Sequence, residues 1–282
     1  MNRKIKKNVM TCCIYILLVI ILIITLFPLF WGISASLRDN SELFQYVTPF
    51  SLNTFVPLKM TIESYIGLFT DYNFLQPILN TLYVTIMSIV LGCVVNSVAA
   101  FAFAMFDFKF KNVIFMLILL SFMIPFEAIA LPLYQVADGF GMVDTHAGMI
   151  VPCIASGLVL FLFVQFFKDI PPSLLEAGRI DGANLAQVFF RIMIPLSKPI
   201  FITAGLMIFM DQWNSYLWPL LIARSKDIRT IQISLTAFQT EHATDWSSLY
   251  AASILSALIP LALFFPFQKY FVQGITSSGV KG

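Results

Sequence analysis

The sequence EAGRIDGANLAQVFFRIMIPLSKP, residues 176–199, is the longest polar interruption that we expect on the cytosolic side of this chain. The whole chain of 282 residues is 59% hydrophobic and only 11% charged, and 29 of its residues are Phe. This composition is typical of a polytopic membrane protein and disfavours a soluble domain. We therefore interpret residues 176–199 as the centre of a loop between two membrane spans.

Six apolar stretches are long enough to cross about 30 Å of hydrocarbon at about 1.5 Å per residue. They predict an all-α polytopic membrane protein whose six transmembrane helices lie at about residues 11–33, 77–105, 113–136, 149–167, 201–221 and 249–271. The other predicted segments are a cytosolic N-terminus at 1–10, a cytosolic loop at 168–199 within a transmembrane domain at 11–272, and a cytosolic tail at 273–282.

Positive charge supports this topology with both termini in the cytosol. Five of the 17 basic residues would lie outside, namely Arg38, Lys59, Arg224, Lys226 and Arg229. The other twelve would face the cytosol: Arg3, Lys4, Lys6, Lys7, Lys109, Lys111, Lys168, Arg179, Arg191, Lys198, Lys269 and Lys281. Short cytoplasmic loops carry an excess of Lys and Arg, so this distribution favours an N-in protein of the cell membrane.

Several functional classes find no support in the residues. A formal net charge of +2 is too small to indicate a nucleic-acid partner. His146 and His242 lie far apart without clustered carboxylates, and no nucleophile–base arrangement is visible, so we expect no metal site and no catalytic residue. The Gly-x-x-x-x-Gly-Lys-Ser/Thr phosphate loop is also absent, so we expect no ATP hydrolysis by that route, and motion driven by ATP would have to come from another polypeptide.

The first half of the cytosolic loop predicts a short helix. Pro171 and Pro172 suit a helix start, where a missing N–H costs little. Residues 174–180 can then form about two turns. Asp181 and Gly182 end them, because a glycine just past a helix end readily adopts the left-handed conformation.

The second half predicts another helix. Asn184 precedes Gln187 at the spacing of a capping box, and the apolar run that follows reaches Pro195. The first helix has an apolar side formed by Leu174, Leu175 and Gly178. That side suits either a groove on a cytosolic partner or the surface of the bilayer, and the pattern alone does not distinguish the two.

The spacing of this loop is similar to that of the EAA loop of ATP-binding cassette (ABC) importer permeases. It reads Glu176-Ala177-Gly178, three residues, Gly182, nine residues, Ile192, one residue, Ile194-Pro195. Gly178 and Ile194 are conservative departures from the usual Ala and Leu. The wider wording resembles the carbohydrate branch, of the maltose and multiple-sugar type, and its second, smaller permease subunit. The stretches that carry this are 171–177, 179–183, 195–199, 80–82, 132–134, 213–214, 219–220, 271–274 and 279–282, with Pro125.

The resemblance implies a bacterial sugar importer in which this chain is half of a heterodimeric pore. The implied partners are the second permease subunit, a homodimer of cytosolic ATP-binding subunits, an extracytoplasmic sugar-binding protein and the lipid bilayer. The chain would bind no cofactor itself, since ATP and Mg would be used by the ATPase. The implied coupling residues, which would dock on that ATPase and transmit its closure, are Leu174, Leu175, Glu176, Ala177, Gly178, Arg179, Asp181 and Gly182.

A polar stripe in the fifth span is a candidate for the translocation path. Asp211, Asn214, Ser215 and Trp218 recur at helical spacing, with Gln212 beside them. Carboxylate and amide groups suit sugar hydroxyls, and an aromatic ring suits a sugar's apolar face. Gating or hydrogen bonding between helices is the alternative role.

The third span contributes Glu127, which lies between Pro125 and Pro132. These two prolines should kink or break the helix. Counted along a straight helix, Glu127 lies in the outer third of the membrane, either on the path or in a structural position. A proton-coupled secondary carrier for a small polar solute is the alternative function, because broken helices and buried carboxylates suit it. The absence of a convincing internal repeat and the presence of the EAA-like loop disfavour that alternative.

Overall fold

A computed structural model describes residues 3–45, 51–239 and 244–279, without the side chains of residues 3–7, 9, 179, 237, 264 and 268–279. The chain separates into two compact units. Unit 1 comprises Met1–Leu75 and Leu235–Leu258, and unit 2 comprises Gln76–Ser234 and Ile259–Gly282.

The described residues are predominantly helical and contain no strand, only an isolated bridge between Gln239 and Thr244. The α-helices are α1 (Arg3–Ser36), α2 (Glu63–Thr70), α3 (Leu75–Met105), α4 (Lys111–Phe122), α5 (Phe126–Gly139), α6 (His146–Ile150), α7 (Gly157–Lys168), α8 (Pro172–Ile180), α9 (Leu185–Gln187), α10 (Ile194–Leu196), α11 (Lys198–Asn214), α12 (Leu217–Ile222), α13 (Ile231–Ser234) and α14 (Trp246–Gly279). A π-helix, Val188–Met193, joins α9 to α10.

Three of these helices are long and apolar enough to cross a membrane, within α1, α3 and α14. Three bent pairs bring the number of candidate spans to six if each pair is one span: α4 with α5, bent by 103°; His146–Cys153 with α7, bent by 46°; and Leu185–Leu196 with α11, bent by 79°. The predicted all-α membrane class is therefore confirmed. The boundaries of the six spans and the orientation of the termini stay predictions.

The prolines of the third predicted span act differently from each other. Pro125 stands at the N-cap of α5, immediately after the break that follows α4, as expected. Pro132 lies inside α5, which continues through it, so this proline does not break the helix, and the kink that it was expected to cause stays a prediction. Because the pair bends by 103°, counting along a straight helix does not give the depth of Glu127.

The side chain of Asn96 forms hydrogen bonds with the backbone at the break between α6 and α7. Its Nδ2 donates to the carbonyl oxygen of Ile154 at 2.8 Å, and its Oδ1 accepts from the N–H of Ser156 at 3.1 Å. The side chain is 3% exposed. Broken helices persist in a membrane only where another group bonds the freed backbone, and Asn96 supplies that group from α3.

Replacing Asn96 with Leu is expected to lower the free energy of unfolding by about 1–3 kcal/mol, because the change leaves buried backbone groups without partners. Denaturant-induced unfolding of the purified chain in detergent would measure it. Asn112→Leu, at an exposed position at the start of α4, is the matched control. Equal losses in the two variants would contradict the assignment.

The start of α3 is tied to the segment 227–231. The Nδ2 of Asn80 donates to the carbonyl oxygens of Asp227 at 2.7 Å and Arg229 at 3.0 Å, and the N–H of Ile231 donates to the hydroxyl of Thr81 at 2.9 Å. These bonds give the Asn80-Thr81 pair a structural role within unit 2.

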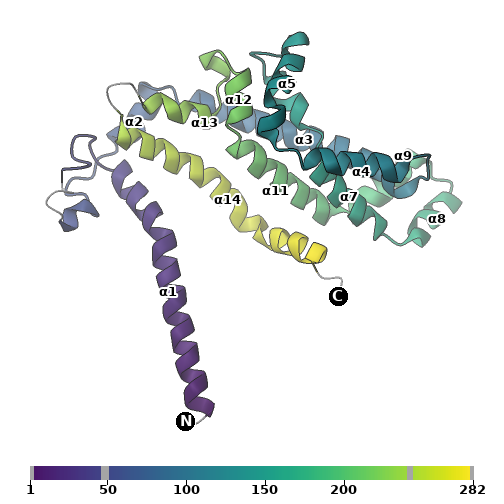
Figure 1. Cartoon of the computed structure of the whole chain (residues 1–282), viewed down its shortest axis with the longest axis horizontal. Coiled ribbons are helices and arrows are strands. Elements are labelled where there is room, and N and C mark those ends of the chain that lie inside the picture. The colour runs from purple at the N-terminus through teal and green to yellow at the C-terminus, as the bar shows by residue number, and fades with distance from the viewer. Residues whose placement is uncertain (1–2, 46–50, 240–243, 280–282) are drawn as a thin grey trace. The chain divides into compact units, whose positions relative to one another are not determined.

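The main apolar core of unit 2 includes the loop after α7. Phe101 of α3, Phe163 of α7, Leu175 of α8, Met193 of the π-helix and Ala204 of α11 are all buried in this one cluster. Figure 1 shows α4, α7 and α11 alongside one another, with α8 at the end of this group. The loop is therefore packed into the helical bundle of its unit.

Candidate functional site

The loop between α7 and α11 has the predicted helix–turn–helix form. Gly182 follows α8 with φ +81°, in the left-handed conformation. The N–H of Ala183 donates to the carbonyl oxygen of Gly178 at 3.0 Å, the long bond of a Schellman motif. Asn184 and Gln187 form the capping box, each side chain accepting from the other's N–H at 2.9 Å. Local rules therefore account for the turn.

The second helix contains an unexpected π-helical segment. Residues 188–193 form this wider turn, with the N–H of Ile194 donating to the carbonyl oxygen of Phe189. The π-helix ends just before Pro195, which has no N–H and whose ring would clash with the carbonyl four residues earlier in an α-helix. Such segments are rare, occur mostly as single turns inside α-helices and are frequent at functional sites.

The inner face of α8 is formed by Leu175 and Gly178. Leu175 is buried in the main core, and a Cβ added to Gly178 would lie 2.5 Å from Cδ1 of Ile192. The absence of a side chain at Gly178 therefore lets α8 approach the π-helix closely. The sequence interpretation that Leu174, Leu175 and Gly178 form one docking side is wrong, because the last two face their own chain.

The outer face of α8 is exposed. Leu174, Ala177 and Ile180 recur at intervals of three residues, and Ile180 is 85% exposed. Glu176, Asp181 and Gly182 are exposed as well, and the side chain of Arg179 lies outside the described part. Ile180 was missed by sequence reasoning, although its spacing from Leu174 and Ala177 signals the same face.

The predicted polar stripe of the fifth span is divided by a helix break. α11 ends at Asn214, Ser215 is extended with φ −64° and ψ 124°, and α12 begins at Leu217. The expectation of one continuous helical face is therefore wrong. Pro219 explains the break, because it cannot donate to Ser215 four residues earlier, whereas in the first turn of α12 no donor is needed.

The polar residues at the end of α11 remain accessible within the single chain. Asp211 and Asn214 are exposed, Ser215 is half-buried and Gln212 is buried. The Nε2 of Gln212 donates to Oδ2 of Asp211 at 3.3 Å, and the Nδ2 of Asn214 donates to the carbonyl oxygen of Met210 at 2.7 Å. Asp211 and Asn214 therefore present polar groups at a helix end.

Trp218 does not belong to this exposed group. It is 2% exposed, and its indole N–H donates to the carbonyl oxygen of Gly148 at 3.1 Å. Its ring meets that of Phe126 edge-on, with 6.0 Å between centroids. Trp218 thus anchors α12 to α5 and α6. This contact also places Glu127, which is exposed and follows Phe126, on an element that packs against α12.

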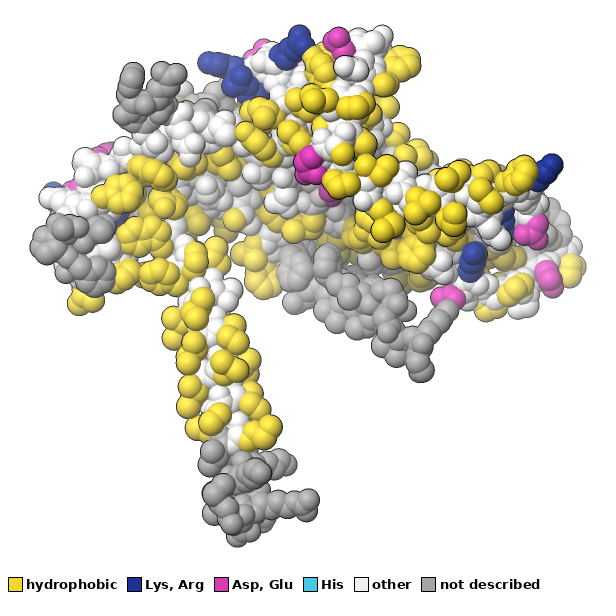
Figure 2. Space-filling view, viewed as in Figure 1, with side chains coloured by type: hydrophobic (Ala, Val, Ile, Leu, Met, Phe, Trp, Pro, Cys, Tyr) yellow, Lys and Arg dark blue, Asp and Glu magenta, His cyan; other side chains and the backbone are white. Residues whose placement is uncertain are grey.

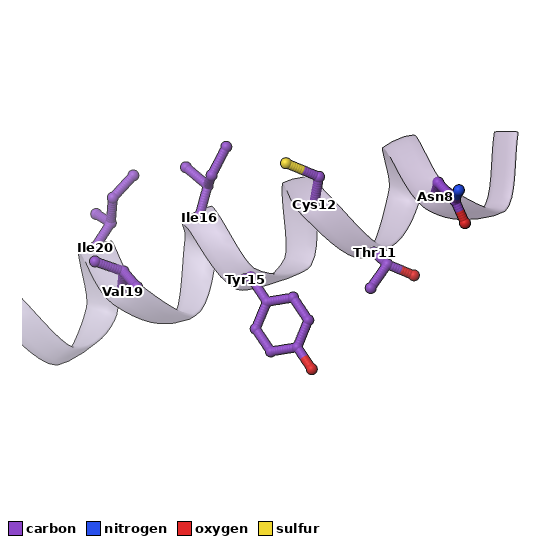
Figure 3. Close-up of a pocket in the computed structure, with 7 residues that line it drawn as sticks. All are labelled: Asn8, Thr11, Cys12, Tyr15, Ile16, Val19 and Ile20. Carbon is purple, nitrogen blue, oxygen red and sulfur yellow. The ribbon is translucent and has the colours of Figure 1, made fainter. Parts of the chain in front are cut away.

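Two hollows are lined by residues of unit 1. A hollow of about 570 Å³ is lined only by residues of α1, so its walls are the surface of one helix (Figure 3). A hollow of about 270 Å³ in unit 1 is lined by the polar side chains of Asp39, Asn40, Tyr72 and Asp245, among others. There, bonds from Ser41 lower the pKa of Asp39, while burial and the neighbouring Asp245 raise the pKa of Tyr72. No group of three potential metal ligands was found among the described residues.

Sequence comparison identifies related proteins over most of the chain. Residues 88–277 match the family described as binding-protein-dependent transport system inner membrane component. The chain is 34% identical to the arabinooligosaccharides transport system permease protein AraQ of Bacillus subtilis, over 91% of each chain. It is 33% identical to the sn-glycerol-3-phosphate transport system permease protein UgpE of Pectobacterium atrosepticum, over 94% of this chain and 95% of that one. It is 28% identical to the lactose transport system permease protein LacG of Rhizobium radiobacter, over 90% and 91%.

Solved structures share the fold. A chain of a bacterial ABC transporter involved in the import of the acidic polysaccharide alginate matches with a TM-score of 0.83 and 22% identity, over 96% of this chain and 99% of that one. A chain of the alginate ABC transporter in complex with a periplasmic protein bound to alginate pentasaccharide matches with a TM-score of 0.67 and 16% identity, over 93% and 94%.

Proposed function

The chain belongs to the family of binding-protein-dependent transport system inner membrane components, and from this membership we propose that it imports a sugar or oligosaccharide as one of two different permease subunits. The family assignment makes the chain a permease subunit of an ABC importer in the inner membrane. The nature of the solute, the subunit arrangement and the site residues are the proposed parts.

The names of the relatives support a polyhydroxylated solute. Permeases for arabinooligosaccharides and lactose lie at 34% and 28% identity, and a permease for sn-glycerol-3-phosphate lies at 33%. Two of these three solutes are sugars, and all three carry at least two hydroxyl groups. We therefore propose a carbohydrate, with a phosphorylated polyol as the second candidate.

The outer face of α8 carries the proposal of energy coupling. Its exposed residues Leu174, Ala177 and Ile180 offer an apolar surface with Glu176 and Asp181 at its border, suited to a groove on an ATP-binding subunit. The close packing of Gly178 against Ile192 supports transmission, because a push on α8 reaches the π-helix and then α11. Packed elements move as units rather than deform continuously.

The proposed partners follow from this role. A homodimer of cytosolic ATP-binding subunits would use ATP and Mg, a second permease subunit would complete the pore, and an extracytoplasmic sugar-binding protein would deliver the solute. This chain would supply no catalytic residue. The last of these partners is supported by the alginate transporter, a structural relative that forms a complex with its loaded periplasmic protein.

Transport energetics test the proposed function against a proton-coupled carrier. Vesicles that contain the chain with the subunits encoded beside it should take up the sugar that co-purifies with their binding protein. We expect uptake to stop when ATP is removed and to persist when an ionophore dissipates the proton gradient. The opposite pattern would favour the secondary carrier.

The end of α11 provides a separate test of the translocation path. Replacing both Asp211 and Asn214 with Ala should reduce uptake and substrate-stimulated ATP hydrolysis about tenfold, because two groups that can bond solute hydroxyls are lost. Asp138→Ala, which removes an exposed carboxylate near the end of α5, is the control. Unchanged uptake in the double variant would remove these residues from the path.

A further inference from the structure

A hollow of about 440 Å³ lies between the start of α4 and the end of α7 in unit 2. It is lined by the turn before α4, by the first residues of α4 and by the last residue of α7: Asp107, Phe108, Phe110, Lys111, Asn112, Val113 and Lys168. None of these residues belongs to the outer face of α8 or to the polar end of α11. The hollow is therefore separate from both parts of the candidate transport machinery.

Lysines from two helices approach this hollow. The Nζ of Lys111 donates to the carbonyl oxygen of Phe106 at 2.8 Å and to Oδ1 of Asp107 at 3.1 Å, so its ammonium is held in place. The side chain of Lys111 is only 19% exposed, whereas that of Asp107 is fully exposed. Lys168 is exposed at the end of α7 and contributes a second, more accessible ammonium.

Aromatic rings flank the charges. The Nζ of Lys168 lies 5.9 Å from the ring centroid of Phe115, and the Nζ of Lys109 lies 5.0 Å from that of Phe110. The lining of the hollow contains two lysines, Lys111 and Lys168, and one carboxylate, that of Asp107, which leaves one excess positive charge. A ring beneath an ammonium keeps it in position without neutralising it.

An apolar surface runs from the hollow along α4. Val113, Met116, Leu117 and Leu120 are each about half exposed or more, and α4 contains no buried residue. Figure 2 shows hydrophobic side chains covering α4, with Lys and Arg side chains interspersed with Asp and Glu side chains at one end of that surface. A charged hollow followed by an apolar helix surface matches a phospholipid, in which a charged headgroup is followed by apolar acyl chains.

We propose that the hollow binds the phosphate headgroup of an anionic phospholipid, whose acyl chains lie along α4. Lys111 and Lys168 hold the phosphate between two elements, and Phe108 and Phe110 cover the glycerol backbone at the membrane boundary. Basic pockets at the membrane surface favour anionic headgroups. The site goes beyond the proposed function, because it depends on the membrane setting and not on the transported solute.

Native mass spectrometry of the full-length chain, released from delipidating detergent, tests the site. Phosphatidylglycerol should bind more tightly than phosphatidylcholine. A lysine at a membrane surface contributes about a fivefold preference for anionic lipid, so Lys168→Gln should weaken phosphatidylglycerol binding about fivefold and Lys111→Gln/Lys168→Gln about 25-fold. Lys168→Arg should retain binding. Lys226→Gln, an exposed lysine far along the chain, is the control.

Several results would overturn the proposal. These are equal binding of the two lipids, an equal loss in Lys226→Gln, or displacement of phosphatidylglycerol by millimolar inorganic phosphate, which would indicate a site for soluble anions. Unchanged lipid binding with weaker assembly of the ATP-binding subunits would make the hollow a protein interface instead. If the double variant unfolds because the Lys111–Phe106 bond is lost, Lys168→Gln alone still decides the question.

Discussion

Replacing Gly182 with Pro is expected to lower both substrate-stimulated ATP hydrolysis and uptake at least tenfold. The chain should still insert into the membrane. Gly182 has φ +81°, and proline is restricted to φ near −65°. Proline also disfavours the helical conformation of the preceding residue, so the end of α8 would unwind. The outer face of α8 would then no longer be presented to the ATP-binding subunit.

A graded series makes the test specific. A Cβ at position 182 meets nothing within 4 Å, so a substitution there acts only through the backbone conformation. Gly182→Asn should retain most activity, because asparagine tolerates the left-handed conformation, and Gly182→Ala should fall between the two. ATP hydrolysis by the reconstituted complex, with and without loaded binding protein, would measure the series. Normal stimulation in Gly182→Pro would refute the coupling role of the loop.

Replacing Gly148 with Ala is expected to cost about 3 kcal/mol or more of stability, because among the glycines evaluated in the described part of the chain an added Cβ meets its nearest atom here. The added Cβ would lie 2.1 Å from the carbonyl oxygen of Met142, which is backbone and cannot rotate away. A shift of Gly148 would also disturb its carbonyl, which accepts from the indole of Trp218, and its N–H, which donates to Thr145.

Gly139→Ala is the matched control, because a Cβ there meets nothing within 4 Å. Alanine is also the better helix former, so this variant should be as stable as the parent or slightly more so. Thermal unfolding in detergent would compare the two. A loss in Gly148→Ala no larger than that in Gly139→Ala would show that the segment 142–148 relaxes easily.

The loop between α7 and α11 was largely predictable, since its conformation depends on neighbours in sequence. The helix start at Pro172, the left-handed Gly182 and the capping box of Asn184 with Gln187 each involve residues within five positions. What the pattern left open was the face of α8 that meets the rest of the chain. Ile192, whose contact with Gly178 sets that face, lies fourteen positions away and on another helix.

The polar end of α11 was predicted less well. The sequence pattern identifies its polar residues. Helical periodicity wrongly predicts that Trp218 shares their face, because the helix breaks at a point that Pro219 signals. The structure assigns Trp218 to the packing of α12. Whether Asp211 and Asn214 contact the solute stays a prediction, for the uptake measurement to decide.

The membrane class of the chain and the helix–turn–helix of the loop were determined by composition, glycine conformation and capping, which act within one or two turns. The tertiary structure alone decided which helix breaks persist and which faces are buried. Asn96 bonds the carbonyl of Ile154 across 58 positions, and Trp218 bonds that of Gly148 across 70. Such bonds form only once separate helices pack together. A local sequence pattern therefore does not predict which distant backbone group will lack a hydrogen-bond partner.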